Sequence, residues 1–402
     1  MQNCATKKTS WWRVATAFIA GCLIATLFGK ASSALVVLIE ELSLTLPEAG
    51  MIISLFSIMS GLLGLVFGVL STRYGALVCA VLGLLICGLG SIGGAYVDSF
   101  EFLLISRIIE GTGFILAVVA LPALIQQATR REDLPIAMGI WGAFMPLGIS
   151  LALLFSPVLL NFWGWRGLWN VIGCVILVWA LIIWLLFKPS NAVSRHVPPI
   201  LAEVLKVKEI ILILFLPQTL WMFLCFAIYS TLFISVVSFL PTLLVEQHST
   251  SLVYANKISA LVVAGNIVGN YCAGFMIKKG ANSGNLLIIG FTIMGVLGAI
   301  MFQSFLGPLG KLICGLGFAI FGGLIPGSLF VISSKLSLGS LSLLVFVGVL
   351  LQGAGIGQAL GASLTTLIVE KFDMWQAASV FMLGIMSLGI IFALILRTKL
   401  SD

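Results

Sequence analysis

Charged side chains are scarce in this 402-residue sequence: Asp, Glu, Lys and Arg together make up 9% of it, and only two residues are His. Apolar residues make up 60%, and the mean hydropathy is +1.21. A soluble domain of this length could not bury so much apolar surface. The composition therefore excludes the soluble classes of protein and indicates a chain whose solvent is mostly lipid.

Motifs for disulfide, metal or nucleotide chemistry are also missing. The eight cysteines form no CxxC pair, and all but Cys4 lie in apolar runs, where we expect small core residues. No GxxxxGKS/T segment occurs, and the GxGxxG match at 88–93 lies inside an apolar run instead of at a strand-to-helix turn. We therefore expect no cofactor, no metal site, no nucleic-acid partner and no enzyme activity.

Twelve apolar runs follow one another along the chain. Each exceeds the ~20 residues that cross a ~30 Å hydrocarbon core, and none alternates with the period of a strand. Because only helices and closed barrels satisfy the backbone in lipid, the runs predict an all-α membrane protein. The predicted helices span residues 14–39, 50–71, 76–97, 100–127, 135–162, 165–187, 213–241, 254–277, 284–304, 307–334, 340–369 and 375–397.

The distribution of lysine and arginine predicts how the chain crosses the membrane. With the N-terminus in the cytoplasm, fifteen of these cations fall on the inner side, and only Arg166, Lys257 and Lys371 fall on the outer side. This bias predicts a bacterial inner-membrane protein with both termini in the cytoplasm. The most polar stretch, 189–212, predicts a cytoplasmic linker between two bundles, 1–188 and 213–402. We expect the protein to be a monomer.

Two short patterns occur once in each half of the chain. Gly64–Gly75 contains a leading glycine, a cation and a turn glycine, and Gly269, Lys278 and Gly280 stand 205 positions after Gly64, Arg73 and Gly75. Residues 107–113 return as residues 311–317, at an offset of 204. Repetition at one offset predicts two similar six-helix bundles.

The first of these patterns, Gly68-Val-Leu-Ser-Thr-Arg-Tyr-Gly75, resembles the signature loop of the major facilitator superfamily, Gly-x-Leu-Ser/Ala-Asp-Arg-x-Gly-Arg/Lys-Arg/Lys. Gly68, Arg73 and Gly75 match this loop, which implies a conformational switch here. Thr72 replaces the family's aspartate, so the charge latch of that aspartate is missing. Arg107-Ile-Ile-Glu-Gly-Thr-Gly113 resembles a second family pattern, Arg-x-x-x-Gly-x-Gly. The resemblance implies the major facilitator fold, with twelve transmembrane helices in two pseudo-symmetric six-helix bundles around a central cavity.

Four charged residues lie inside predicted helices: Lys30, Arg107, Glu110 and Lys311. An ionised side chain at mid-helix costs roughly 2.5–3.5 kcal/mol on insertion, so such residues need partners or a function. We predict that Lys30, Arg107 and Lys311 bind an anionic solute and that Glu110 carries a coupling proton. In the alternative interpretation, Arg107 and Glu110 form a permanent i,i+3 ion pair and Lys311 reaches the membrane surface.

Uncharged polar residues in the helices are further candidates for a solute site. We predict that Tyr229, Asn266 and Gln352 contact the solute. Asn270 lies in the same predicted helix as Asn266, and Gln358 lies in the same predicted helix as Gln352. The two asparagines equally suit hydrogen bonds between helices, because amide side chains hold transmembrane helices together.

These features predict a secondary active transporter that moves a small anionic or zwitterionic organic solute. Access would alternate as residues 1–188 rock against residues 213–402, driven by the proton gradient. One alternative is a proton-coupled exporter of drugs or metabolites, because residues 139–148 partly match the Gly-x-x-x-Gly-Pro-x-x-Gly motif of the family's drug/proton antiporters. A second alternative is a membrane receptor or scaffold that does not transport.

Overall fold

The computed structural model describes residues 8–44, 46–188, 211, 213–337 and 343–401. The predicted linker 189–212 lies, apart from residue 211, outside the described residues. The first half contains α1 (Trp11–Leu42), α2 (Leu46–Tyr74), α3 (Ala76–Gly94), α4 (Phe100–Ala128), α5 (Leu134–Gly142) and α6 (Phe144–Phe187). The second half contains α8 (Pro217–Val237), α9 (Leu240–His248), α10 (Leu252–Lys278), α11 (Ser283–Met301), α12 (Pro308–Leu336), α13 (Leu343–Phe372) and α14 (Ala377–Ser401).

Eleven segments of the described chain are long and apolar enough to cross a membrane. The longest, Leu134–Phe187, has 54 residues. At 1.5 Å per residue it is about 80 Å long, enough to cross the ~30 Å hydrocarbon core twice. The segment turns at Gly164, which has φ of 63°. Glycine adopts this left-handed conformation readily because it has no Cβ. This segment contains two predicted helices, so the eleven segments agree with twelve crossings and with an all-α membrane protein.

Two of the predicted helices are interrupted in the structure, and a proline follows each break. The predicted helix 135–162 is interrupted at Ala143 between α5 and α6, three residues before Pro146. The predicted helix 213–241 ends at Val237, and α9 begins with a proline in its first turn. Because proline lacks an N–H group, it fits the first turn of a new helix and disrupts a continuous one.

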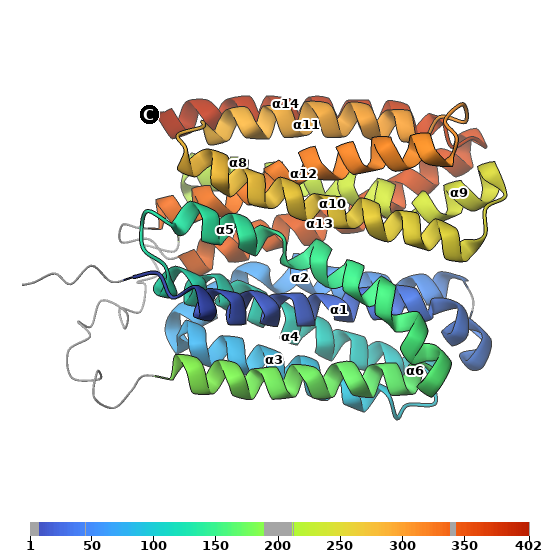
Figure 1. Cartoon of the computed structure of the whole chain (residues 1–402), viewed down its shortest axis with the longest axis horizontal. Helices are drawn as coiled ribbons and strands as arrows, with labels where there is room; N and C mark the ends of the chain where they lie inside the picture. Colours follow the sequence, from blue (N-terminus) through green and yellow to red (C-terminus); the bar gives the residue numbers. More distant parts are fainter. Residues whose placement is uncertain (1–7, 45, 189–210, 212, 338–342, 402) are drawn as a thin grey trace, which may run out of the picture.

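The two halves lie side by side, the first below the second in Figure 1, with α5 between them. Within the first half α1 packs on α6 and α3 packs on α4, while in the second half α12 packs on α10 and α11. The halves meet mainly where α2 packs on α13 and α5 packs on α10. Arg73 and Lys278 lie in the last turns of α2 and α10, and Arg130 lies in the loop after α4. We call this end of the molecule the basic end.

The backbone repeats the sequence repeat. The described residues contain six with positive φ, and they form three pairs. Ser43 and Ser249 follow α1 and α9, Gly75 and Gly280 follow α2 and α10, and Gly164 and Asp373 form the third pair at a similar spacing. Turns with matching geometry at matching places show that the two bundles are pseudo-symmetric. The structure is thus the predicted pair of related helical bundles.

Glycines allow the halves to touch closely near the basic end. A Cβ on Gly348 of α13 would lie 2.5 Å from the backbone oxygen of Gly64 in α2. A Cβ on Gly139 of α5 would lie 2.8 Å from the Cα of Gly274 in α10. These distances are too short for any larger side chain, so both contacts require glycine. Such backbone-to-backbone packing is typical of close transmembrane helix pairs.

Candidate functional site

A cavity lies between the two halves, with about 920 Å³ of space that no atom fills, part of it open. Its walls come from α1, α2, α4, α5 and α6 on one side and from α8, α12 and α13 on the other. Sites for small organic molecules are mostly apolar and occur preferentially where two domains meet. The cavity is therefore the candidate site for a solute.

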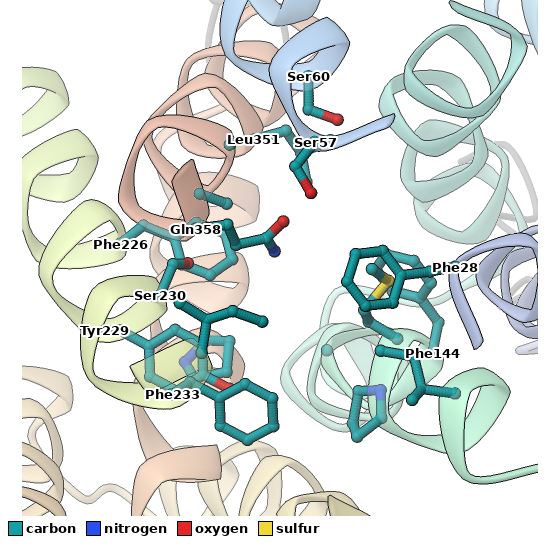
Figure 2. A pocket seen from close by; sticks show the side chains of 18 of the residues that line it. Phe28, Ser57, Ser60, Phe144, Phe226, Tyr229, Ser230, Phe233, Leu351 and Gln358 are labelled. Atoms are coloured by element: carbon teal, nitrogen blue, oxygen red, sulfur yellow. The ribbon is translucent and has the colours of Figure 1, made fainter. Parts of the chain in front are cut away.

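The wall of this cavity is largely aromatic. In Figure 2, Phe28 and Phe144 face Tyr229 and Phe233 across the open space. Among the described residues that line it, none carries a charge. The aromatic lining residues are Phe28, Phe56, Phe114, Phe144, Phe226, Tyr229, Phe233 and Phe330. Such a wall binds apolar or ring-shaped groups by contact area and by ring stacking.

Besides the Tyr229 hydroxyl, four uncharged polar side chains give the cavity its hydrogen-bonding capacity. Ser57 and Ser60 come from α2, Ser230 from α8 and Gln358 from α13. Figure 2 shows the Gln358 amide pointing into the space, with the two α2 serines on the neighbouring wall. Within the described part of the chain, the Gln358 amide has no hydrogen-bond partner. A carboxamide offers both donors and acceptors, so Gln358 is well placed to fix the orientation of a solute.

The charged residues of the first half form a separate site, which we call the buried triad: Lys30, Arg107 and Glu110. The Lys30 Nζ donates to Glu110 Oε1 at 2.6 Å, and Arg107 Nη1 donates to Glu110 Oε2. The Lys30 ammonium also donates to Ser91 Oγ at 2.6 Å. All three triad side chains have 0% exposure. The ion pair of Arg107 with Glu110 is the one that the i,i+3 spacing suggested, and Lys30 joins it from another helix.

Backbone groups and aromatic rings complete the surroundings of the triad. Arg107 donates to the carbonyl oxygens of Leu27 in α1 and Ile52 in α2, each at 3.1 Å. Its guanidinium carbon lies 4.9 Å from the centre of the Phe56 ring. The Lys30 Nζ lies 4.4 Å from the centre of the Trp169 ring. Since Phe56 also lines the cavity, one aromatic ring separates the guanidinium from the solute space.

Lys311 lies apart from both the cavity and the triad. Its Nζ donates to the backbone oxygens of Met301 at 2.7 Å and Gln303 at 3.2 Å. These carbonyl groups lie at and just beyond the end of α11, where backbone oxygens lack partners within the helix. A cation at this place also interacts favourably with the helix dipole. Lys311 therefore acts in this structure as a cap of α11.

Of the uncharged candidates from the sequence, Tyr229 lines the cavity. Its hydroxyl lies 3.4 Å from Asn266 Oδ1. Asn266 and Asn270 are themselves fully buried, and their amides donate to Ala319 O and Asn266 Oδ1. Asn266 thus stands behind the cavity wall, consistent with the interhelical interpretation. Gln352 lies beside Gly64, where α13 meets α2, and is not among the lining residues.

The loop predicted to be a conformational switch lies at the basic end. Gly75 has φ of 88°, and Gly68 packs against Leu344 at the start of α13. Arg73 is exposed and lies over the ring of Tyr74.

In the related loop of the second half, Lys278 forms an ion pair with Asp133 at 2.8 Å, across the boundary between the halves. Asp133 also accepts from the Thr9 hydroxyl at 2.6 Å. Its hydrogen bonds with Lys278 and then Thr9 lower the pKa of the Asp133 carboxyl.

The sequence interpretation missed most of the cavity wall. Phenylalanine and serine are common in membrane helices, so Phe28, Phe56 or Ser230 carries no distinguishing signal. The spacing of Ser57 and Ser60, three apart in an apolar helix, was the best available hint because it puts both hydroxyls on one face. As for metals, the described part of the chain contains no group of three His, Cys, Asp or Glu side chains that would hold an ion.

The fold and the site together define a polytopic membrane protein with an aromatic-rich cavity between two repeated bundles. Residues 17–347 match the sequence profile of the Major Facilitator Superfamily, and the chain belongs to this family. Its homologues are membrane transporters. It is 25% identical over 274 residues to the hexuronate transporter of Bacillus subtilis (strain 168), a match that covers 66% of this chain and 64% of that protein. It is 27% identical over 148 residues to the inner membrane transport protein YajR of Escherichia coli (strain K12), covering 37% of this chain and 32% of that one.

Solved structures confirm the fold. The proton:xylose symporter XylE superposes with a TM-score of 0.75 at 14% identity, over 96% of this chain and 94% of that one. The transporter FucP in an outward conformation superposes with a TM-score of 0.70 at 16% identity, over 95% and 98%. At these identities the likeness shows the fold alone. The choice of solute must therefore be argued from the cavity of this chain.

Proposed function

We propose that this protein is a secondary active transporter for a neutral organic solute with an apolar or aromatic face and one hydrogen-bonding edge. The observation that carries the proposal is the cavity wall, which has eight aromatic rings, the polar side chains of Ser57, Ser60, Ser230 and Gln358, and no charged side chain among the described lining residues. A neutral solute would stack on the rings and turn its polar edge toward Gln358.

Alternating access is the proposed mechanism. The two pseudo-symmetric halves touch through glycines near the basic end, and the ion pair of Asp133 with Lys278 joins them there. These contacts support a state in which the basic end is closed. Transport would then require both glycine contacts to separate as residues 1–188 rock against residues 213–402. We keep the prediction that the basic end and both termini face the cytoplasm of a bacterium.

Coupling to protons is the second part of the proposal, and we place it in the buried triad. The sequence predicted Glu110 as the coupling residue, and its carboxylate lies at the centre of the triad. Buried charges in a membrane-spanning bundle are expensive, and in transporters they mark proton or ion sites. The structural neighbour XylE is described as a proton:xylose symporter, which supports the proposal that transport is coupled to protons.

An anionic solute remains the second candidate, because one relative is a hexuronate transporter. In this structure the cations that would bind such a solute are engaged elsewhere. Lys30 and Arg107 are bound to Glu110, and Lys311 is bound to backbone oxygens. An anion would have to displace these partners, and for that reason we favour the neutral solute.

Phenyl β-D-glucoside and phenyl β-D-glucuronide test this choice, because they differ mainly by one carboxylate. We expect the purified protein to bind the glucoside at least tenfold more tightly in isothermal titration, and proteoliposomes to exchange labelled glucoside across the membrane. Gln358→Leu should weaken binding roughly 2- to 10-fold, the effect of one lost hydrogen bond. Gln352→Leu, in the same helix but outside the cavity, is the matched control.

Tighter binding of the glucuronide would support the anionic solute instead. Binding without exchange would support a receptor or scaffold. No binding of either compound, or equal effects of the two glutamine variants, would contradict the proposed site.

A further inference from the structure

The buried triad carries an unbalanced charge. Lys30 and Arg107 contribute +2 and Glu110 contributes −1, so the ionised triad has a net charge of +1 at zero exposure. The charged and titratable groups that face Lys30 are Glu110 and Arg107 from α4 and Cys87 from α3. α6 presents the Trp169 ring and a carbonyl oxygen, neither of which can supply a negative charge. No described anion balances the second cation.

Among the three side chains of the buried triad, only one proton exchange brings the net charge to zero, and the neighbouring Cys87 thiol is engaged with the backbone oxygen of Glu110. Protonation of Glu110 would raise the net charge to +2 and remove the acceptor that both cations use. Arg107 keeps its proton at any physiological pH, because a guanidinium does not titrate in proteins. Loss of a proton from Lys30 leaves a neutral pair of Arg107 with Glu110. A buried net charge is strongly disfavoured in a low dielectric, so charge balance selects Lys30.

We propose that the ε-amino group of Lys30 is the proton-exchanging group of this transporter and that Glu110 is its fixed counterion. The inference rests on the proposed coupling of transport to protons and gives the coupling a specific residue. Lysine amines exchange protons readily when they are buried, which suits this assignment.

The surroundings of Lys30 fit both of its protonation states. As an ammonium, Lys30 donates to Glu110 and to Ser91 and lies over the Trp169 ring, a favourable place for a cation. As an amine, it has a lone pair that needs a donor. The Ser91 hydroxyl, which now donates to the carbonyl oxygen of Trp169 at 2.7 Å, is the neighbour that can turn toward it. The protonation state would therefore change the contacts among α1, α3 and α6.

The same helix connects Lys30 to the cavity. Phe28, two positions before Lys30 in α1, lines the cavity and packs edge-on against Phe56. Leu27, one position earlier, accepts a hydrogen bond from Arg107. A shift of α1 on protonation would therefore move the aromatic wall that contacts the solute. This gives a physical route between the proton and the solute without direct contact between them.

Lysine NMR tests the assignment without any solute. The protein is labelled with ¹³C,¹⁵N-lysine, placed in lipid nanodiscs and titrated. We expect one buried lysine signal to change from the ammonium to the amine form within the physiological pH range. That signal should disappear in Lys30→Arg and persist in Lys311→Arg, the matched control at the other buried lysine. A Lys30 signal that stays in the ammonium form throughout this range would overturn the proposal.

A transport measurement supplies the second readout. Exchange of phenyl β-D-glucoside in proteoliposomes is measured across the same pH range. We expect Lys30→Arg, which fixes the charge at +1, and Lys30→Met, which fixes it at zero, to lose the pH dependence whatever their absolute rates. Lys311→Arg should keep it. If wild-type protein does not exchange the glucoside, the proposed function fails while the NMR titration still decides the role of Lys30. Retained pH dependence in both Lys30 variants would contradict the inference.

Discussion

The two halves of this protein share a frame but differ in the residues that occupy corresponding positions. Arg107 in α4 corresponds to Lys311 in α12, at an offset of 204. Arg107 forms part of the buried triad, whereas Lys311 caps the end of α11. At the same offset Cys314 stands in place of Glu110, so the second half has no carboxylate to hold a cation there.

Lys30 has no charged counterpart either. Ser235 follows it by 205 positions and donates to backbone oxygens of α8 and α13. At the positions that correspond to the buried triad, the second half therefore has two neutral side chains and one cation, Lys311, that is bound to backbone carbonyl groups, whereas the first half uses three charged side chains. The turns and helix contacts therefore maintain the repeated frame, while a cluster of buried charges occurs at these positions in the first half alone.

The largest effect should come from removing the carboxylate that distinguishes the halves. Glu110→Gln leaves two buried cations without their shared counterion, and we expect a loss of about 3–5 kcal/mol in the free energy of unfolding. Cys314→Ser, at the corresponding place in the second half, should change it by less than about 1 kcal/mol. Unfolding in mixed detergent micelles measures both. Similar losses for the two variants would mean that the halves do not differ in this respect.

An intermediate effect should come from the places where the halves meet. Gly348→Ala puts a Cβ 2.5 Å from the backbone oxygen of Gly64, so the basic end should open. Spin labels on Arg73→Cys and Lys335→Cys, in a background without the native cysteines, report the distance across this end. We expect a clear shift of the population toward longer distances.

The control for this opening is Gly384→Ala in α14, where an added Cβ meets no atom within 4 Å. It should leave the distance distribution unchanged. A closed basic end in the Gly348→Ala variant would show that the glycine contacts do not determine closure.

The smallest effect should come from the ion pair between the halves. Asp133→Asn removes a partly exposed pair with Lys278, and such pairs contribute about 0–1 kcal/mol. Because its hydrogen bonds with Lys278 and Thr9 lower the pKa of Asp133, its contribution is present at neutral pH and is lost as pH falls through that lowered pKa.

The same spin-label pair measures this effect. At low salt and neutral pH the Asp133→Asn variant should open the basic end slightly more than wild type. The difference should shrink in high salt, which screens exposed charges, and disappear in acid. A difference that is independent of both salt and pH would assign the effect to packing around α5 instead of charge.

Much of the frame was predictable because its signals are local in the sequence. Apolar run length gave the helices, and the offset of the turn glycines 75 and 280 gave the repeat, which their shared positive φ reproduces. The breaks at Ala143 and after Val237 were not predicted, although prolines near both were visible. Whether a proline bends a helix or starts a new one depends on the packing around it, and the sequence does not contain that information directly.

The site was much less predictable. The i,i+3 pair of Arg107 with Glu110 follows from helix geometry, and the sequence offered it as one of two interpretations. The pair of Lys30 with Glu110 joins residues 80 positions apart, and it forms because α1 and α4 pack together. The cation that caps α11 and the phenylalanines that line the cavity likewise depend on which face each helix turns toward its neighbours.

The amino-acid sequence is sufficient to specify a helical membrane protein made of two repeated bundles. Helix length, hydropathy and repetition are properties of a one-dimensional string, and lipid permits few structures for such a string. The tertiary structure alone decided that the cavity is aromatic and uncharged at its described lining, and that the cations are held by partners behind or away from it. Those facts depend on rotation and contact of helices distant in the chain, because a buried charge is stable only where packing brings it a partner.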